Sequence, residues 1–146
     1  QFFTITDEEM TRFTITLTEG VNMVLWSIAN AIGGEIFVPK IPSYKILDMA
    51  EAINPKKKVK IIGIRPGEKL HEEMIGIADA ENTIDLGKYY AILPYDNQEM
   101  LKKYLSKKSF KAKKVPKLFS YSSDLNEDFV SVDVLRDMIN ESNDSL

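Results

Sequence analysis

Residues 59–72, VKIIGIRPGEKLHE, join an apolar run to a tight turn that carries several charged side chains. The run Val59 to Ile64 is typical of a buried β-strand. Pro66-Gly67 directly after it predicts a sharp turn, because proline fixes φ and glycine accepts a positive φ. Since α/β proteins bind ligands at the ends of strands, this turn is the first place to expect function.

The charges around the turn are a guanidinium, a carboxylate and an ammonium, from Arg65, Glu68 and Lys69. Such a cluster suits a diphosphate joined to a diol. Arg65 can bridge phosphate oxygens, and Glu68 can accept hydrogen bonds from ribose hydroxyls. The spacing alone leaves a second interpretation open, a Pro-Gly turn with an exposed ion pair, which is the commoner case.

Strand-like and helix-like segments alternate along the chain, which indicates an α/β fold. Asn54-Pro55 should end the second helix, because the residue before proline avoids the α region. The predicted order is a strand at 12–15, a helix from a capping box at 16–19 to about 31, a strand at 35–38, a helix at 46–53 capped by Ser43, a strand at 59–64, a strand at 89–93, a helix at 96–105 and a helix at 132–139 capped by Ser131. The polar tail after Ile139 is expected to fray.

An apolar stripe at helical spacing lies on one face of the predicted first helix. It consists of Leu17, Val21, Val24, Leu25 and Ile28. Met23, Trp26 and Ile32 make the segment apolar on a second side as well. We therefore expect this helix between two layers, and we expect the chain by itself to expose an apolar patch.

Residues 102–117 contain eight lysines and no acidic residue, with Pro116 near the end. We interpret this stretch as an exposed loop or flap, because like charges repel one another and resist burial. The sequence then divides into a ligand-binding lobe at 1–95 and a C-terminal extension at 96–146, which holds the flap and the last helix.

The composition excludes several classes of site. The 146 residues include 22 acidic and 19 basic residues, so the whole-chain charge gives no reason to expect nucleic acid or a membrane as partner. Cysteine is absent and His71 is the single histidine, which removes disulfides, thiolate zinc sites and multi-histidine metal sites. We expect a cytoplasmic protein and, because the sequence begins at Gln1, a piece of a longer polypeptide.

Two further polar residues, Arg12 and His71, are predicted to have no functional role when each is taken alone. Phe13 and Ile15 should face the core, which leaves Arg12 on the accessible side of its strand as a solvated charge. His71 is interpreted as a hydrogen-bonded turn residue, because no serine or cysteine nucleophile pattern accompanies it. No catalytic residue is assigned.

Four motifs, in order, resemble the C-terminal part of the inverting UDP-N-acetylglucosamine 4,6-dehydratases. They are TDEEMTRF at 6–13, GGEIFVPKIPS at 33–43, GIRPGEKLHE at 63–72 and YSSD at 121–124. This family belongs to the extended short-chain dehydrogenase/reductase enzymes, whose N-terminal Rossmann half holds NADP. The resemblance implies an α/β fold of short strands with flanking helices, the C-terminal substrate-binding lobe, with the Rossmann half absent. No GxxGxxG turn occurs in the sequence.

The resemblance also implies roles for individual residues. In related enzymes two arginines clamp the diphosphate of the nucleotide sugar, and their positions look like Arg12 and Arg65. The acidic residue three places after the second arginine holds the ribose, which corresponds to Glu68. Lys40 follows a strand that lines the nucleotide pocket and is a further candidate for substrate binding.

The implied reaction of the parent enzyme oxidises C4 of UDP-N-acetylglucosamine, eliminates water across C5 and C6, and returns hydride to C6 with inversion at C5. The 4-keto-6-deoxy product would serve surface glycans of the pseudaminic-acid type or flagellin glycosylation. NADP is expected in the missing half and none in this chain, so the chain alone is expected to be inactive. The expected partners are a UDP-sugar, the Rossmann half and further copies of the protein.

Three alternatives remain open. The runner-up among enzymes is the lobe of a UDP-sugar 4-epimerase or of a retaining 4,6-dehydratase, since both would use the same diphosphate clamp. The third is a non-catalytic module for nucleotide-sugar binding or assembly.

Overall fold

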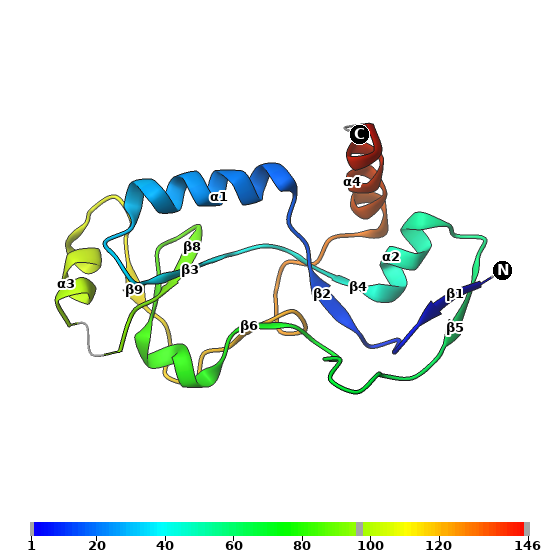
Figure 1. The fold of residues 1–146 in the computed structure, drawn as a ribbon, viewed down its shortest axis with the longest axis horizontal. Helices are drawn as coiled ribbons and strands as arrows, with labels where there is room; N and C mark the ends of the chain where they lie inside the picture. Colours follow the sequence, from blue (N-terminus) through cyan, green and yellow to red (C-terminus); the bar gives the residue numbers. More distant parts are fainter. Residues whose placement is uncertain (1, 96–97, 145–146) are drawn as a thin grey trace. The chain divides into compact units, whose positions relative to one another are not determined.

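The computed structural model describes residues 2–95 and 98–144, which form two compact units (Figure 1). Among these residues, unit 1 comprises 2–16, 41–72 and 122–144, and unit 2 comprises 17–40 and 73–121. Each unit therefore combines stretches that are separated in the sequence. The predicted division at residue 95 stays a prediction.

Unit 1 contains two pairs of short strands and two helices. Strand β1 pairs in parallel with β5, and β2 pairs with β4 in antiparallel fashion, with Arg12 opposite Tyr44. Helix α2 packs against α4. The bounds are β1 (Phe2–Ile5), β2 (Thr11–Phe13), β4 (Ser43–Lys45), α2 (Ile46–Ile53), β5 (Lys58–Ile61) and α4 (Val132–Asp144).

Unit 2 is built on a four-stranded antiparallel sheet with the order β3-β8-β7-β9. Strand β10 (Tyr121–Ser122) leads the chain from unit 2 back to unit 1. The other elements are α1 (Leu17–Asn30), β3 (Ile36–Pro39), β6 (Glu73–Ile75), the 3-10 helix η1 (Ile77–Asn82), β7 (Thr83–Asp85), β8 (Tyr89–Ile92), α3 (Gln98–Ser106) and β9 (Lys113–Lys114).

The core of unit 2 lies between the sheet and helix α3. Its buried members are Ile84, Leu86, Ala91, Leu93, Met100 and Tyr104. Trp26 of α1 packs beside this core, with its ring 4.4 Å from Tyr89, 5.1 Å from Phe37 and 5.7 Å from Phe110 between centroids. Aromatic contacts of this kind hold α1 to the sheet.

The main apolar stripe of α1 is exposed, which agrees with the expectation that the chain by itself exposes an apolar patch. Leu17 and Ile28 are 85% and 75% exposed, and Val21, Val24 and Leu25 are exposed as well. The helix instead turns its second apolar side inward. The reason is that Trp26 meets three aromatic rings there, and large aromatic surfaces contribute more burial than aliphatic ones.

Ser43 does not cap α2, contrary to the prediction. It lies in β4 and is fully buried, and α2 begins after Lys45, which makes no side-chain cap hydrogen bond. The hydroxyl of Ser43 instead accepts a hydrogen bond from Asn126 at 3.0 Å. The predicted end of α2 at Asn54-Pro55 is confirmed.

The predicted buried strand at 59–64 is shorter and is exposed. Strand β5 spans Lys58–Ile61, and all four of its residues are exposed. Ile62 and Ile64 beyond it are 45% and 46% exposed. The cause is that β5 pairs with β1 alone among the described residues, and a two-stranded parallel pair lacks the layers that usually cover both faces.

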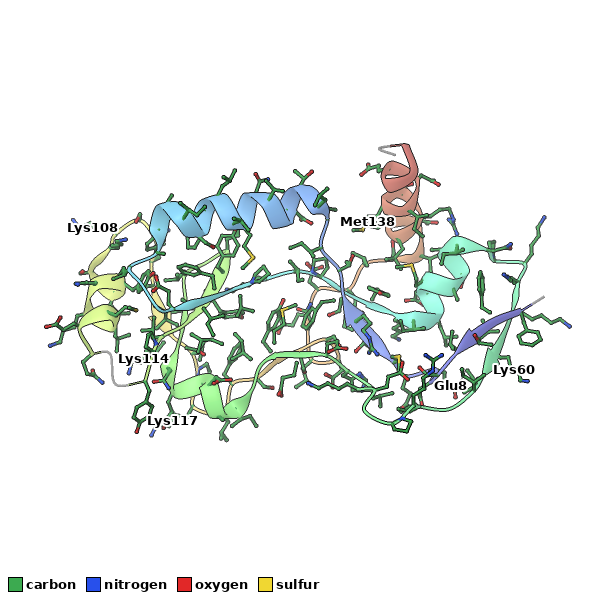
Figure 2. The ribbon with its side chains drawn as sticks, in the orientation of Figure 1. Glu8, Lys60, Lys108, Lys114, Lys117 and Met138 are labelled. Carbon is green, nitrogen blue, oxygen red and sulfur yellow. The ribbon has the colours of Figure 1, made fainter. Side chains whose placement is uncertain are left out.

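The lysine-rich stretch 102–117 is folded and is not a continuous loop, which corrects the prediction. Its first residues complete α3, and β9 pairs with β7. Tyr104, which is fully buried, anchors the stretch to the core of unit 2. All eight lysines are nevertheless exposed, and Figure 2 marks Lys108, Lys114 and Lys117 among them.

Two of the predicted helix boundaries involve residues that lie outside those described. Helix α3 begins at Gln98, whereas the predicted helix began at Asp96, which lies outside the described residues. The tail expected to fray after Ile139 continues α4 as far as Asp144, and residues 145–146 again lie outside the described residues.

A partly buried hydrogen bond joins α3 to the segment that follows α1 within unit 2. The phenol of Tyr104 donates to Glu35 Oε1 at 2.6 Å, and the amides of Ile32 and Gly33 donate to the same carboxylate. Burial raises the pKa of Tyr104, and the hydrogen bond and charge of Glu35 raise it further. Burial by itself would raise the pKa of Glu35, but the hydrogen bonds from Tyr104 and the amides outweigh burial and lower this pKa.

Tyr104→Phe should lower the free energy of unfolding by about 1–3 kcal/mol, because it removes a donor to a carboxylate and keeps the ring. A carboxyl whose pKa is lowered in the folded state adds stability above its unfolded pKa, about 4.3 for Glu, and this stability is lost as pH falls through the folded pKa. Urea unfolding near pH 7 should therefore show a larger difference between the two proteins than unfolding near pH 3. An equal difference at both pH values would contradict the role of Glu35.

The exposed stripe of α1 should make the chain by itself associate, because contiguous apolar patches drive association. Leu25→Glu combined with Ile28→Glu should lower the mass measured by sedimentation, with the free energy of unfolding changed by less than about 0.5 kcal/mol. The matched control is Thr18→Glu with Asn22→Glu, which adds the same charge at exposed polar positions of α1. A wild-type chain that sediments as a monomer would contradict the prediction.

Candidate functional site

The Pro-Gly turn predicted at 65–68 is confirmed in unit 1. The Glu68 amide donates to the Arg65 carbonyl at 3.0 Å, and Gly67 has a φ of +81°, which favours glycine at this position. The Arg65 amide in turn donates to Glu68 Oε2 at 3.1 Å. The side chain of Glu68 therefore closes the turn that its own backbone helps to form.

Glu68 has a second partner, the hydroxyl of Thr6, which donates to Oε1 at 3.3 Å. An ionised carboxylate offers about four acceptor positions. Since Glu68 accepts from only Arg65 and Thr6 among the described residues, it retains acceptor positions for a ligand. Arg65 is exposed, and its guanidinium makes no ion pair among the described residues.

Arg12 is not a solvated strand charge, which corrects that interpretation. Its side chain is 19% exposed, and its guanidinium binds main-chain oxygens of its own strand and of residues 69 and 70. Nη1 donates to the carbonyls of Thr11 at 2.7 Å and Leu70 at 3.0 Å, and Nη2 donates to Lys69 at 3.0 Å. Nε lies 3.4 Å from Glu72 Oε1.

These contacts leave Arg12 with a fixed position and a spare donor. A guanidinium has five N–H groups; three of them donate to the carbonyl oxygens above and Nε faces Glu72 in an ion pair, so among these contacts one hydrogen on Nη2 remains. The carbonyl partners carry no net charge, and the positive charge of Arg12 is balanced in part only by Glu72. The arrangement suits an anion that approaches from the side of Nη2.

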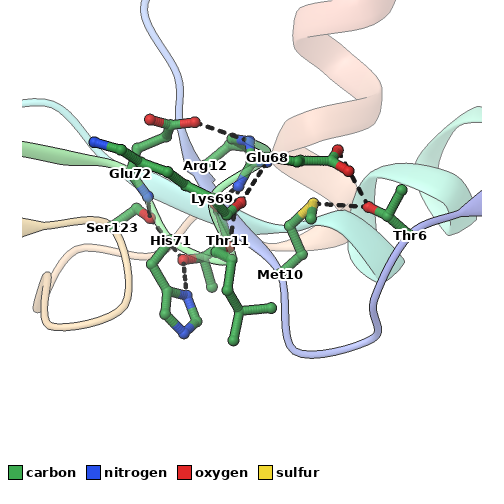
Figure 3. A network of polar contacts seen from close by, with 10 residues as sticks. Thr6, Met10, Thr11, Arg12, Glu68, Lys69, His71, Glu72 and Ser123 are labelled. Atoms are coloured by element: carbon green, nitrogen blue, oxygen red, sulfur yellow. Dashed lines mark hydrogen bonds and ion pairs between the residues drawn. The ribbon is translucent and has the colours of Figure 1, made fainter. Parts of the chain in front are cut away.

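Three side chains beside Arg12 form a second polar cluster, which Figure 3 shows at close range. Thr11 Oγ1 lies 2.8 Å from His71 Nδ1 and 2.6 Å from Ser123 Oγ. The Glu72 amide donates to Ser123 Oγ at 2.9 Å, and the Ser123 amide donates to the Glu72 carbonyl at 2.8 Å. The interpretation of His71 as a hydrogen-bonded residue is confirmed.

Sequence reasoning missed Thr11 and Ser123 as members of this cluster. Both lie in motifs quoted above, TDEEMTRF and YSSD, but each is a small polar residue with no charge and no characteristic spacing. The signal was their place inside motifs that also carry Arg12 and an aspartate. Their partners lie 60 and 112 positions apart in the sequence, which no local pattern can reveal.

Lys40 belongs to unit 2 and has local partners there. Its ammonium lies 2.6 Å from Asp85 Oδ1 and 4.4 Å from the centroid of the Tyr90 ring. Burial by itself would raise the pKa of Asp85, but the hydrogen bond from Lys40, the Gly87 amide and the charge of Lys113 outweigh it and lower this pKa. The structure thus groups Arg12, Arg65 and Glu68 in unit 1 and places Lys40 in the other unit.

The structure offers no cluster of side chains for a metal ion: in residues 2–95 and 98–144 no group of three or more His, Asp or Glu residues is arranged to hold one. The described part of the chain also has no helix that is both long enough and apolar enough to cross a membrane.

Comparison with known proteins identifies relatives of nearly the whole chain. The chain is 46% identical over 142 residues to the UDP-N-acetylglucosamine 4,6-dehydratase (inverting) of Campylobacter jejuni serotype O:23/36, a match that covers 94% of this chain and 42% of the relative. It is 39% identical over 101 residues to the UDP-glucose 4-epimerase of Rickettsia canadensis, covering 66% of this chain and 29% of that protein.

A solved structure, Pen from Bacillus thuringiensis, shares the fold. It superposes with a TM-score of 0.74 at 27% identity, over 97% of this chain and 41% of that one. The predicted fold class, an α/β C-terminal lobe of an extended short-chain dehydrogenase/reductase with short strands and flanking helices, is confirmed.

The resemblance stated from the four motifs is confirmed as well. The chain spans about two fifths of the length of the 4,6-dehydratases that it matches and corresponds to their C-terminal part. A model of the family described as "Polysaccharide biosynthesis protein" matches residues 1–94. With this match over more than half of its length, the chain belongs to the polysaccharide biosynthesis protein family.

Proposed function

We propose that this chain supplies the UDP-sugar site of a nucleotide-sugar 4,6-dehydratase that inverts C5. The likeness to Campylobacter enzymes of that name supports the proposal. The observation that carries it is the fixed guanidinium of Arg12 beside the turn of Arg65 and Glu68 in unit 1. A diphosphate next to a ribose diol needs this combination of donors and acceptors.

The two arginines have different parts in the proposed clamp. Arg12 is held by carbonyl oxygens and offers one N–H and its charge from a fixed position. Arg65 is exposed and keeps its side-chain donors for the ligand, so it can close on the phosphates from a mobile position. A fixed and a mobile cation together bind a diphosphate at less entropic cost than two mobile ones.

Glu68 completes the proposed contacts of unit 1. Glu68 accepts hydrogen bonds from the ribose hydroxyls at the positions that Arg65 and Thr6 leave open. Lys40, in unit 2, is kept as a separate candidate for nucleotide binding, since its ammonium has donors beyond the one that binds Asp85. These residues bind and orient the sugar nucleotide, and none of them is assigned a proton-transfer step.

NADP is the proposed cofactor of the complete enzyme, where it would supply the hydride chemistry. The described residues of this chain do not fit it. Helices α1 and α4 follow Thr16 and Ser131 and no glycine-rich turn, and the positive-φ glycines Gly63 and Gly67 precede no helix. No step of the proposal therefore uses this chain to hold the cofactor.

For the complete protein we propose the removal of water across C5 and C6 of UDP-N-acetylglucosamine, giving a 4-keto-6-deoxy sugar nucleotide for surface glycans. We further propose that it works in the cytoplasm as an assembly of several copies. A UDP-sugar 4-epimerase is the second candidate, because the Rickettsia relatives of that name match 66% of this chain.

Arg65→Ala in the complete protein should weaken UDP binding by about 2–4 kcal/mol, since it removes charge-assisted donors from the diphosphate. Arg65→Lys should recover part of this loss, because an ammonium cannot present two parallel donors. Isothermal titration calorimetry with UDP measures both. Arg136→Ala is the matched control, because that arginine pairs with Asp133 on α4. Unchanged UDP affinity in Arg65→Ala would overturn the clamp.

The complete protein should convert UDP-N-acetylglucosamine to a 4-keto-6-deoxy product, while the 146-residue chain alone should show no turnover. The chain contains the residues proposed to bind the substrate, but its described residues do not fit NADP. Nuclear magnetic resonance of the product distinguishes the candidates: a 6-deoxy sugar inverted at C5 supports the proposal. A C4 epimer that keeps its 6-hydroxyl would establish the epimerase instead.

A further inference from the structure

Two buried hydroxyls beside Arg12 form a chain between a backbone amide and the single histidine of the sequence. Ser123 Oγ receives the Glu72 amide at 2.9 Å, lies 2.6 Å from Thr11 Oγ1, and Thr11 Oγ1 lies 2.8 Å from His71 Nδ1. Ser123 is fully buried and Thr11 is 5% exposed. Neither hydroxyl has a further hydrogen-bond partner among the described residues.

The direction of the hydrogen bonds in this chain follows from counting hydrogens. The Glu72 amide can only donate, so Ser123 Oγ accepts there and keeps its own hydrogen for Thr11. Thr11 then donates its hydrogen to Nδ1 of His71, which must be unprotonated. The His71 ring therefore carries its hydrogen on Nε2.

The opposite direction leaves a buried donor without an acceptor. If Nδ1 of His71 carried the hydrogen, it would donate to Thr11, and Thr11 would donate to Ser123. Ser123 Oγ would then accept twice, and its own buried hydrogen would have no hydrogen-bond acceptor among the described residues. Burying an unpaired donor is unfavourable, so the hydrogen bonds all run in one direction, from the Glu72 amide to His71.

The row of hydrogen bonds through Ser123, Thr11 and His71 fixes the segment whose carbonyl oxygens bind Arg12. Glu72 is tied to Ser123 by both its amide and its carbonyl, and the Thr11 amide donates to Leu70 at 3.2 Å. Leu70 and the preceding Lys69 supply two of the three carbonyl oxygens that bind the guanidinium. A shift of residues 69–72 would therefore move the donors of Arg12.

We propose that Thr11 and Ser123 are positioning residues of the UDP-sugar site: through the one-directional chain to His71 they hold residues 69–72, and thereby the guanidinium of Arg12, in place for the diphosphate. This inference rests on the proposed function. Neither hydroxyl needs to touch the substrate. Their loss should weaken substrate binding and leave the rate of the bound enzyme nearly unchanged.

The first test is kinetic and uses the complete protein. Thr11→Val and Ser123→Ala should each raise KM for the UDP-sugar about five- to tenfold with kcat within about twofold, because a misplaced Arg12 weakens binding in ground and transition states alike. Thr11→Ser keeps the hydroxyl and should restore KM. Ser122→Ala is the matched control, since that buried neighbour donates to Asp124 and lies outside the chain of hydroxyls.

The second test measures the His71 ring and needs no substrate. With histidine labelled by ¹⁵N and the His71 signal assigned through His71→Gln, neutral wild-type protein should show hydrogen on Nε2 and an unprotonated Nδ1. Thr11→Val and Ser123→Ala should move the two nitrogen frequencies towards each other as the second tautomer becomes populated. Thr11→Ser should leave them unchanged. Even if a variant fails to fold, the measurement on the wild-type protein still tests which nitrogen of His71 carries the hydrogen.

The outcomes separate this inference from the proposed function. If Arg65→Ala weakens UDP binding but Thr11→Val and Ser123→Ala leave KM unchanged, the positioning role is overturned and the clamp stands. A hydrogen on Nδ1 of His71 in the wild-type protein overturns the proposed direction of the hydrogen bonds. If Arg65→Ala leaves UDP binding unchanged, the proposed function itself fails, and the ¹⁵N result then reports on the hydroxyl chain alone.

Discussion

The guanidinium of Arg12 binds carbonyl oxygens from its own strand and from residues 69 and 70, and the arrangement of the candidate site depends on this contact. Carbonyl oxygens hold a guanidinium without cancelling its charge. Arg65 and Lys69 add two more cations to the same segment, against the carboxylates of Glu68 and Glu72. These five side chains therefore give three cations against two carboxylates, while the position of Arg12 is set by neutral groups, an arrangement that suits an anion.

Structural features that depend on residues adjacent in the sequence could be predicted from the sequence alone. The turn at Pro66-Gly67 and the end of α2 before Pro55 follow from backbone restrictions that hold in any context. Ser43 shows the limit of such rules. A serine shortly before a helix is a good cap by propensity, but Asn126, 83 positions away, binds its hydroxyl inside the protein. The preference of a residue type cannot reveal a partner so distant.

Helical periodicity could locate α1 but could not choose between its two apolar sides. The stripe through Leu25 and Ile28 matches the expected spacing better, yet Trp26 on the other side meets the sheet of unit 2. Periodicity measures how apolar residues are spaced and contains no information on the surface opposite them. The same holds for Arg12, whose exposure was predicted from the alternation of its strand, while its carbonyl partners come from 57 and 58 positions along the chain.

The two units are interleaved in the sequence, and this order has a consequence for folding during synthesis. Every segment of unit 2 has been made once residue 121 is added, so its sheet and helices can assemble then. Unit 1 must wait, because its stretch from 122 onward supplies α4 for packing against α2 and Ser123 for the contact with Thr11, 112 positions earlier. Such distant pairings form slowly, since a long loop has to close before they contribute. The nascent chain can therefore complete unit 2 while Thr11 and the segment 69–72 still lack Ser123 as a partner.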